Sequence, residues 1–199
     1  MAVSAVAFVG LLVVVAVLRA VELVISRRHQ QALRLRGVRA GADPDFVWMV
    51  SLHTAILVGA ALEVVLLRRP FIPVLAFSAA TVFVLSNALR WWVIRTLGTH
   101  WNVRVMDSAG LGVVTAGPFR WVRHPNYAAV FLELAALPLI HTAWITSLMG
   151  SLAHLRVLSL RLSAEEAVLS QHPDYRALML HKPRFVPRLF GRHRAWPDV

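Results

Sequence analysis

The stretch GPFRWVRHPNY, residues 117–127, interrupts a chain that is otherwise dominated by long apolar runs. Its Gly117-Pro118 pair is a turn signal, and Pro125 favours an extended conformation at His124. Two arginines, a histidine, an asparagine and a tyrosine follow one another closely in it. Since Tyr127 opens the next apolar run, we expect the stretch to lie where a membrane helix meets water. Taken alone, it is typical of a basic interfacial anchor with aromatic side chains.

The composition around this stretch is that of a membrane protein. Of 199 residues, 58% are hydrophobic and 16% are charged, and the mean hydropathy is +0.63. A water-soluble domain of this length would not carry so much apolar surface. The net charge of +11 comes from 21 basic and 10 acidic residues. Because the arginines cluster between and after apolar runs, we expect them to contact anionic membrane lipids, and no nucleic acid.

The apolar runs predict an all-α integral membrane protein with five membrane-inserted helices in a single domain, residues 1–199. The first half, residues 1–94, holds three spans at about 3–25, 46–67 and 71–94. The second half, residues 95–199, is the candidate catalytic half. It contains a polar loop, a helical hairpin at about 127–140 and 143–160, and a C-terminal tail.

The connections between these runs predict packing and orientation. A basic amphipathic connector, residues 26–39, should lie on the headgroup surface. The short connection Arg68-Arg69-Pro70 predicts that the second and third spans form an antiparallel hairpin. With the N-terminus outside, nearly all loop arginines face inward, which places the polar loop and the tail in the cytoplasm. The arginine-rich composition and short N-terminal half favour the inner membrane of a bacterium.

Several ionisable residues fall inside or beside predicted helices. His53 and Glu63 in the second span indicate a polar cavity or a partner helix, because such groups are costly in lipid. His141 and His154 in the hairpin could line a substrate cavity or satisfy hydrogen bonds between helices, and we favour the latter. The histidines of the tail lack ligand spacing, and the chain has no cysteine, so we predict no metal.

A second polar segment begins at Arg161 with the sequence RLSAEEAVL, and continues through Tyr175 to PRFVP at residues 183–187. With Gly117-Pro118-Phe119 and the RHPNY of residues 123–127, in this order, it resembles the isoprenylcysteine carboxyl methyltransferase family of integral membrane enzymes. The similarity covers roughly residues 95–190. It implies S-adenosylmethionine as cofactor, S-adenosylhomocysteine as product, and a lipophilic methyl acceptor embedded in the membrane.

The resemblance also implies roles for individual residues. Its cofactor-binding positions fall on Arg104, Leu111, Gly112, Val113, Val114, Phe119, His124, Pro125, Asn126, Tyr127 and Glu165. Its substrate-binding arginine falls on Arg161, which together with Glu165 forms the implied catalytic pair. The eukaryotic members have glutamine at the position of Arg104 and tyrosine at that of Phe119.

The chemistry of these residues is compatible with such roles. Glu165 can accept hydrogen bonds from ribose hydroxyls, and Arg161 can hold a carboxylate through two parallel hydrogen bonds. The two residues are four apart and share one helical face. The alternative to these separate roles is therefore a solvated salt bridge between Arg161 and Glu165. A carboxylate acceptor needs no general base. A phenol or amine must lose a proton, and His124 is the obvious base for that step.

We therefore predict methyl transfer to a lipophilic acceptor, as O-methylation of an isoprenoid or lipid-like carboxylate or of a phenolic lipid. N-methylation of a phospholipid amine is the alternative within the same fold. A non-catalytic membrane protein, such as a transporter subunit, is the alternative from another class. His53 and Glu63 would be the evidence for that transporter.

Overall fold

The computed structural model describes residues 3–41 and 45–187, and within these residues the regular structure is helical apart from an isolated bridge between Ala40 and Met106. This confirms the all-α prediction. The end of the predicted tail, residues 188–199, lies outside the described residues. The long helices are α1 (Val3–Leu35), α2 (Phe46–Leu66), α3 (Pro73–Leu97), α4 (Pro125–Leu139) and α5 (Trp144–Leu169), and a short α6 (Pro173–Met179) follows. Short 3₁₀ turns lie at Gly98–His100, Ala109–Leu111 and Gly117–Arg120.

The first helix is longer than the sequence analysis predicted. α1 runs without a break to Leu35, so the predicted connector at residues 26–39 is mostly the end of this helix. The added turns consist largely of arginine, glutamine, leucine and alanine, which favour helix, and they contain no glycine or proline. The helix stops where Gly37 adopts a φ of 80°, as glycine often does after a helix end.

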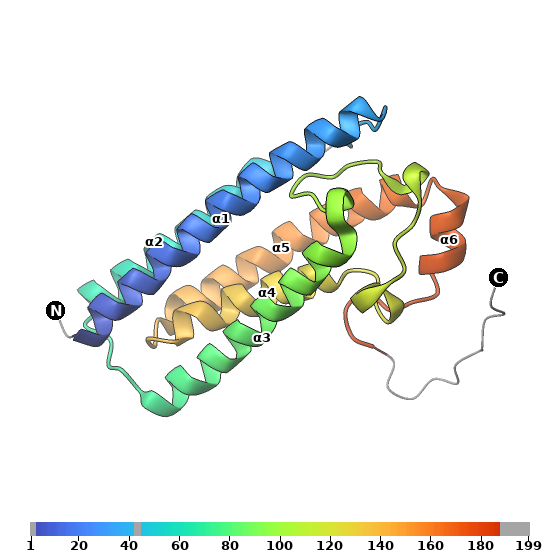
Figure 1. Ribbon diagram of the computed structural model, residues 1–199. Helices are drawn as coiled ribbons and strands as arrows, with labels where there is room; N and C mark the ends of the chain where they lie inside the picture. Colours follow the sequence, from blue (N-terminus) through green and yellow to red (C-terminus); the bar gives the residue numbers. More distant parts are fainter. Residues whose placement is uncertain (1–2, 42–44, 188–199) are drawn as a thin grey trace.

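The second and third spans lie close to their predicted positions and run antiparallel as predicted, but they do not pack closely against each other (Figure 1). α2 packs against α5 and α1, while α3 packs mainly against α4 (Figure 1). One reason is Glu63 on α2, whose buried carboxylate accepts hydrogen bonds from the backbone of Ile145 and Thr146 at the start of α5. These hydrogen bonds attach α2 to the α4–α5 pair. That pair does form the predicted hairpin.

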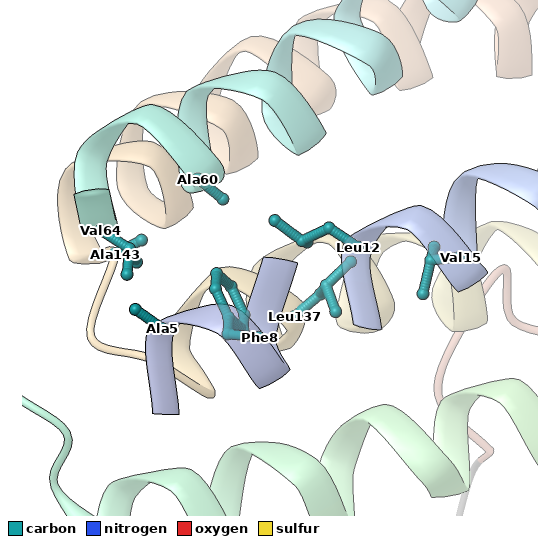
Figure 2. Packing of buried hydrophobic residues seen from close by; sticks show 8 residues of the cluster. All are labelled: Ala5, Phe8, Leu12, Val15, Ala60, Val64, Leu137 and Ala143. Atoms are coloured by element: carbon teal, nitrogen blue, oxygen red, sulfur yellow. The ribbon is translucent and has the colours of Figure 1, made fainter. Parts of the chain in front are cut away.

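A compact apolar cluster joins α1, α2 and the α4–α5 hairpin at the end of the bundle remote from the polar loop (Figure 2). Phe8 and Leu12 of α1 lie against Ala60 and Val64 of α2, with Leu137 completing the contact. Small side chains at this crossing let the helices approach closely. The cluster therefore fixes how α1 and α2 stand relative to the hairpin.

Three helical segments are long and apolar enough to cross a membrane: Val3–Leu35, Phe46–Leu66 and Pro73–His100. Their outward side chains are large and apolar, as Val13, Val58 and Phe77 show. This agrees with an integral membrane protein, because a water-exposed surface of this kind would associate. α4 has only 15 residues, and the count of five membrane-inserted helices stays a prediction.

The polar loop and the tail fold together at one end of the bundle, beside α6 (Figure 1). Backbone N–H groups of Arg123 and His124 donate to the carbonyl oxygens of Pro183 and Arg184, both at 2.9 Å. Lys182 Nζ donates to the carbonyl oxygen of Phe119 at 2.8 Å. Two segments far apart in the sequence thus hold each other in place, and together they cover the end of the helices that carry the predicted site.

Candidate active site

A cavity of about 460 Å³ lies at the polar end and continues between the helices. Its walls come from all six α-helices and from the loop that joins α3 to α4. The predicted site residues on these walls are Arg104, Gly112, Val113, Val114, Phe119, His124, Pro125, Asn126, Tyr127, Arg161 and Glu165. Of the predicted set, Leu111 is the residue that does not line this cavity. Its side chain packs instead against Leu33, Val38 and Met106, and its role stays a prediction.

His124 marks the change from loop to helix. It precedes α4 with φ −127° and ψ 57°, and Pro125 occupies the first helical turn, where its missing N–H is not needed. The His124 ring is buried, and its Nε2 lies 3.0 Å from Oε1 of Glu166 on α5. The loop motif is therefore tied to α5 through a side chain that the predicted set did not contain.

Glu166 is the centre of that connection. Besides His124, its carboxylate receives Arg123 Nη1 at 3.0 Å and Arg184 Nη2 at 2.7 Å. Burial alone would raise the pKa of the Glu166 carboxyl, but hydrogen bonds from Arg184 and His124 and the charge of Arg123 outweigh it and keep the pKa below its ordinary value. A signal for this role was present in the sequence. Adjacent residues on a helix point about 100° apart, so Glu165 and Glu166 had to face different partners.

Glu165 faces the cavity with Tyr127 and Arg161. The Tyr127 hydroxyl donates to Oε2 of Glu165, and Arg161 Nη2 donates to the carbonyl oxygen of Val103 at 2.7 Å. Arg161 is only 5% exposed, so a solvated salt bridge does not describe it. A guanidinium held this way has a fixed orientation at the cavity wall, which is what binding of a planar anion requires.

Several buried polar atoms on the same walls have no hydrogen-bond partner among the described residues, and Trp101 Nε1, Asn126 Oδ1 and the Tyr175 hydroxyl are among them. Tyr175 is only 5% exposed, and burial, together with the nearby charge of Glu165, raises its pKa to about 12, so it stays a neutral donor. Unpaired buried polar atoms are uncommon in folded proteins. Their presence along one cavity indicates that this wall can form hydrogen bonds with a polar ligand.

Deeper in the bundle, the cavity meets charged residues that the site prediction did not include. Arg19 and Glu22 of α1 pair at 2.7 Å, and this pair contacts charged residues of other helices. Arg90 of α3 donates to Glu22 at 3.1 Å, and Arg19 also pairs with Glu133 of α4. The two arginines and two glutamates balance in formal charge, which favours their burial as a network over any one of them alone. In the described part of the chain, no three His, Asp or Glu side chains are grouped as metal ligands.

The three helices long and apolar enough to cross a membrane, together with a cavity that reaches from the polar end into the bundle, are typical of an integral membrane protein with an internal binding site. Residues 78–171 match the Isoprenylcysteine carboxyl methyltransferase (ICMT) family, so this part of the chain is similar to a family of methyltransferases. The match runs from α3 to the end of α5 and contains every predicted site residue. The chain is also 28% identical over 163 residues to "Uncharacterized protein YpbQ" of Bacillus subtilis (strain 168), covering 81% of this chain and 96% of that relative.

Proposed function

We propose that this protein transfers a methyl group from S-adenosylmethionine to the carboxylate of a lipophilic acid in the membrane. The observation that carries the proposal is the single cavity. It links the polar residues around Glu165 and Arg161 to the space between α2, α4 and α5. A polar cofactor bound at the polar end could therefore meet an acceptor whose long hydrocarbon chain lies between the helices.

The polar end of the cavity fits S-adenosylmethionine. The cofactor carries an adenine, a ribose diol, an ammonium and a carboxylate, so it needs both donors and acceptors. Among the described residues, Asn126 Oδ1 is an acceptor without a partner, and Trp101 Nε1 and the Tyr175 hydroxyl are donors without one. Glu165 is the carboxylate best placed to accept from the ribose hydroxyls, with Tyr127 fixing its orientation. The aromatic ring of Phe119 and the apolar Val113 and Val114 line the same space.

The reaction would rest mainly on positioning and on exclusion of water. S-adenosylmethionine supplies an electrophilic methyl group on a sulfonium. Arg161 would bind the acceptor carboxylate and aim one of its oxygens at this methyl, while the carbonyl oxygen of Val103 accepts a hydrogen bond from the guanidinium. A carboxylate at neutral pH is already deprotonated, so no residue has to accept a proton. The carboxylate oxygen forms the new bond to carbon as the bond to sulfur breaks.

The other candidate acceptors would need a base, and the structure offers less support for one at His124. A phenol or an amine must lose a proton, but His124 Nε2 lies against Glu166 within a cluster that ties the loop to α5. This contact favours a positioning role for His124. A carboxylate acceptor avoids the requirement altogether.

Glu63 is one of the two residues that would indicate a transporter, and its contacts give it a structural role instead. Its carboxylate accepts from Arg69 Nε at 3.0 Å and from the backbone and hydroxyl of Thr146, each at 2.7 Å. Glu63 does not line the cavity, and its bonds attach α2 to α5. An ionisable residue with this many partners is a helix-to-helix link.

We further propose that all five long helices are inserted in the membrane, with the polar end in the cytoplasm. The distribution of arginine supports this orientation, because Arg68 and Arg69 are the basic residues of the opposite end. α4 and α5 would then be membrane helices shielded by α1, α2 and α3. A cytoplasmic site would also have direct access to S-adenosylmethionine.

The test is methyl transfer from tritiated S-adenosylmethionine into a bacterial lipid extract by the purified protein in detergent. A carboxylate acceptor gives a methyl ester, whose label is released by mild alkali, whereas a phenol ether or a methylated amine keeps its label. We expect alkali-labile label in the lipid fraction. Alkali-stable label would overturn the choice of acceptor, and no label above that of a boiled sample would overturn the function.

A further inference from the structure

Two histidines face each other across the part of the cavity that lies within the bundle. His53 of α2 and His154 of α5 have ring centroids 5.4 Å apart with an angle of 47° between the rings. Both line the same cavity as Arg161. The ring of Phe131 stacks on His154 with a centroid distance of 6.3 Å, so an aromatic contact holds the His154 ring in place.

His154 is buried without the hydrogen bonds that its ring requires. It is 3% exposed, and neither of its ring nitrogens has a partner among the described residues. His53 Nε2 is also buried without one. The prediction of a hydrogen bond between helices is therefore wrong for His154. It is confirmed for His141, whose Nε2 lies 3.2 Å from Oγ of Ser4. Because an unpaired buried polar group is costly, the wall at His154 favours a ligand that supplies the missing partner.

The distance between His154 and Arg161 determines which part of a bound ligand could form a hydrogen bond with His154. The two residues are seven apart on α5, which is about two helical turns along one face, or about 10 Å. An acceptor whose carboxylate lies at Arg161 and whose chain follows the cavity would pass His154 at roughly that distance. The partner must therefore be a substituent on the chain, separate from the carboxylate.

The charges around the histidines decide what kind of substituent fits. Arg19, Glu22 and Arg90 line the neighbouring wall, and Glu133 completes their network. Their formal charges balance, so a second ionic group on the acceptor would be buried without a counter-charge. A neutral group that can form hydrogen bonds with imidazole nitrogens meets no such penalty. Hydroxyl and carbonyl groups are of this kind.

We propose that His53 and His154 form a second polar subsite, which binds a hydroxyl or carbonyl group on the hydrocarbon chain of the acceptor, about two helical turns from the methylated carboxylate. This rests on the proposed function, since it takes the acceptor carboxylate to lie at Arg161. The natural acceptor is then an oxygenated long-chain acid. A plain fatty acid leaves the His154 ring unpaired and binds less tightly.

The test uses palmitic acid and its positional isomers with a single hydroxyl along the chain. Dissociation constants are measured for the purified protein in detergent with saturating S-adenosylhomocysteine, and the same acids are assayed as methyl acceptors. The variant is His154→Phe, which keeps an aromatic ring beside Phe131. The matched control is His141→Phe, which removes a buried histidine remote from the cavity lining. Binding of S-adenosylhomocysteine shows that each variant is folded.

We expect the wild type to bind one or a few neighbouring isomers about tenfold more tightly than palmitic acid. This preference should disappear in His154→Phe and persist in His141→Phe, while palmitic acid itself binds all three proteins alike. Equal affinity across the isomers in the wild type would overturn the subsite even if every acid is methylated, and this result needs no variant. A preference that survives in His154→Phe would overturn it too. Preferential binding that depends on His154, without methyl transfer, would support the subsite and count against the proposed reaction.

Discussion

Glu63 and Glu165 lie at opposite ends of the helix bundle, and both are carboxylates in contact with hydroxyl groups of neighbouring helices. Glu63 receives hydrogen bonds from Arg69, Ile145 and Thr146, and it does not line the cavity. Glu165 lies on the wall of the large cavity. Its surroundings include the unpaired hydroxyl of Tyr175.

This difference separates a carboxylate that stabilises the fold from one that is available to a ligand. Glu63 is buried and Glu165 is partly buried, and removing a charge from water is expensive in both places, so burial alone does not indicate function. At Glu63 the protein itself provides the donors. Around Glu165 the cavity and the unpaired atoms leave room for donors from outside. Mutations near Glu63 should therefore lower stability, whereas mutations near Glu165 should lower ligand binding or methyl transfer.

The largest effect is expected for Arg161→Lys. An ammonium cannot reproduce the two parallel hydrogen bonds of a guanidinium to a carboxylate, so methyl transfer should fall by about a hundredfold. Affinity for S-adenosylhomocysteine should stay within about twofold, since Arg161 is assigned to the acceptor. The comparison is Arg69→Lys, beside Glu63, which should lower thermal stability and leave transfer unchanged. Equal losses of transfer in the two variants would show that Arg161 has only a structural role.

Glu166→Gln should give the next largest effect, through the loop that carries His124. Its ion pairs with Arg123 and Arg184 join that loop and the tail to α5, so the variant should melt at a lower temperature at neutral pH. The lowered pKa of Glu166 means that its folded form binds the proton less readily than the unfolded chain. Its stabilisation is thus complete above the ordinary glutamate pKa of about 4.3 and is lost as the pH falls through the lower folded value.

The measurement is the difference in melting temperature between wild type and Glu166→Gln as a function of pH. Taking the difference removes the titration of the other carboxylates, which both proteins share. We expect a constant difference from neutral pH down to about pH 5 and a shrinking one below it. A difference that grows on acidification would contradict the assignment of Glu166 as an ionised link.

A smaller effect is expected for Tyr175→Phe. The Tyr175 hydroxyl is buried and has no partner among the described residues, so its removal should leave the melting temperature of the ligand-free protein unchanged or slightly raised. If the hydroxyl binds the cofactor, affinity for S-adenosylhomocysteine should fall about fivefold. Calorimetric titration and a thermal melt of the same sample measure both quantities. Lower stability with unchanged affinity would assign Tyr175 to the fold.

The sequence predicted the helices better than their packing. Apolar runs located all five long helices, because length and hydropathy are local properties. They did not predict that α3 would pack on α4 and not on α2, since that choice depends on contacts such as the one between Glu63 and Thr146. The end of α1 was misplaced because a basic helix and a basic connector have the same composition.

The site shows a similar division. Ordered motifs identified the cavity wall from Arg104 to Glu165, and the structure brings these residues to one cavity with the exception of Leu111. They could not identify Trp101, whose unpaired nitrogen only becomes apparent once its surroundings are known. They also misjudged His154, because whether a buried histidine has a partner depends on the neighbouring helix. Pairing of polar atoms is a property of the assembled fold.

The most direct test of the account is calorimetric titration of S-adenosylhomocysteine into wild type, Glu165→Gln and Glu63→Gln. Removing the charge of Glu165 should weaken binding by about tenfold to a hundredfold, because a charge-assisted hydrogen bond to the ligand is lost. Glu63→Gln should bind as tightly as wild type while melting at a lower temperature, since its carboxylate serves the fold. Equal affinity in wild type and folded Glu165→Gln, or no binding by the wild type, would contradict the central claim that the cavity around Glu165 is the cofactor site.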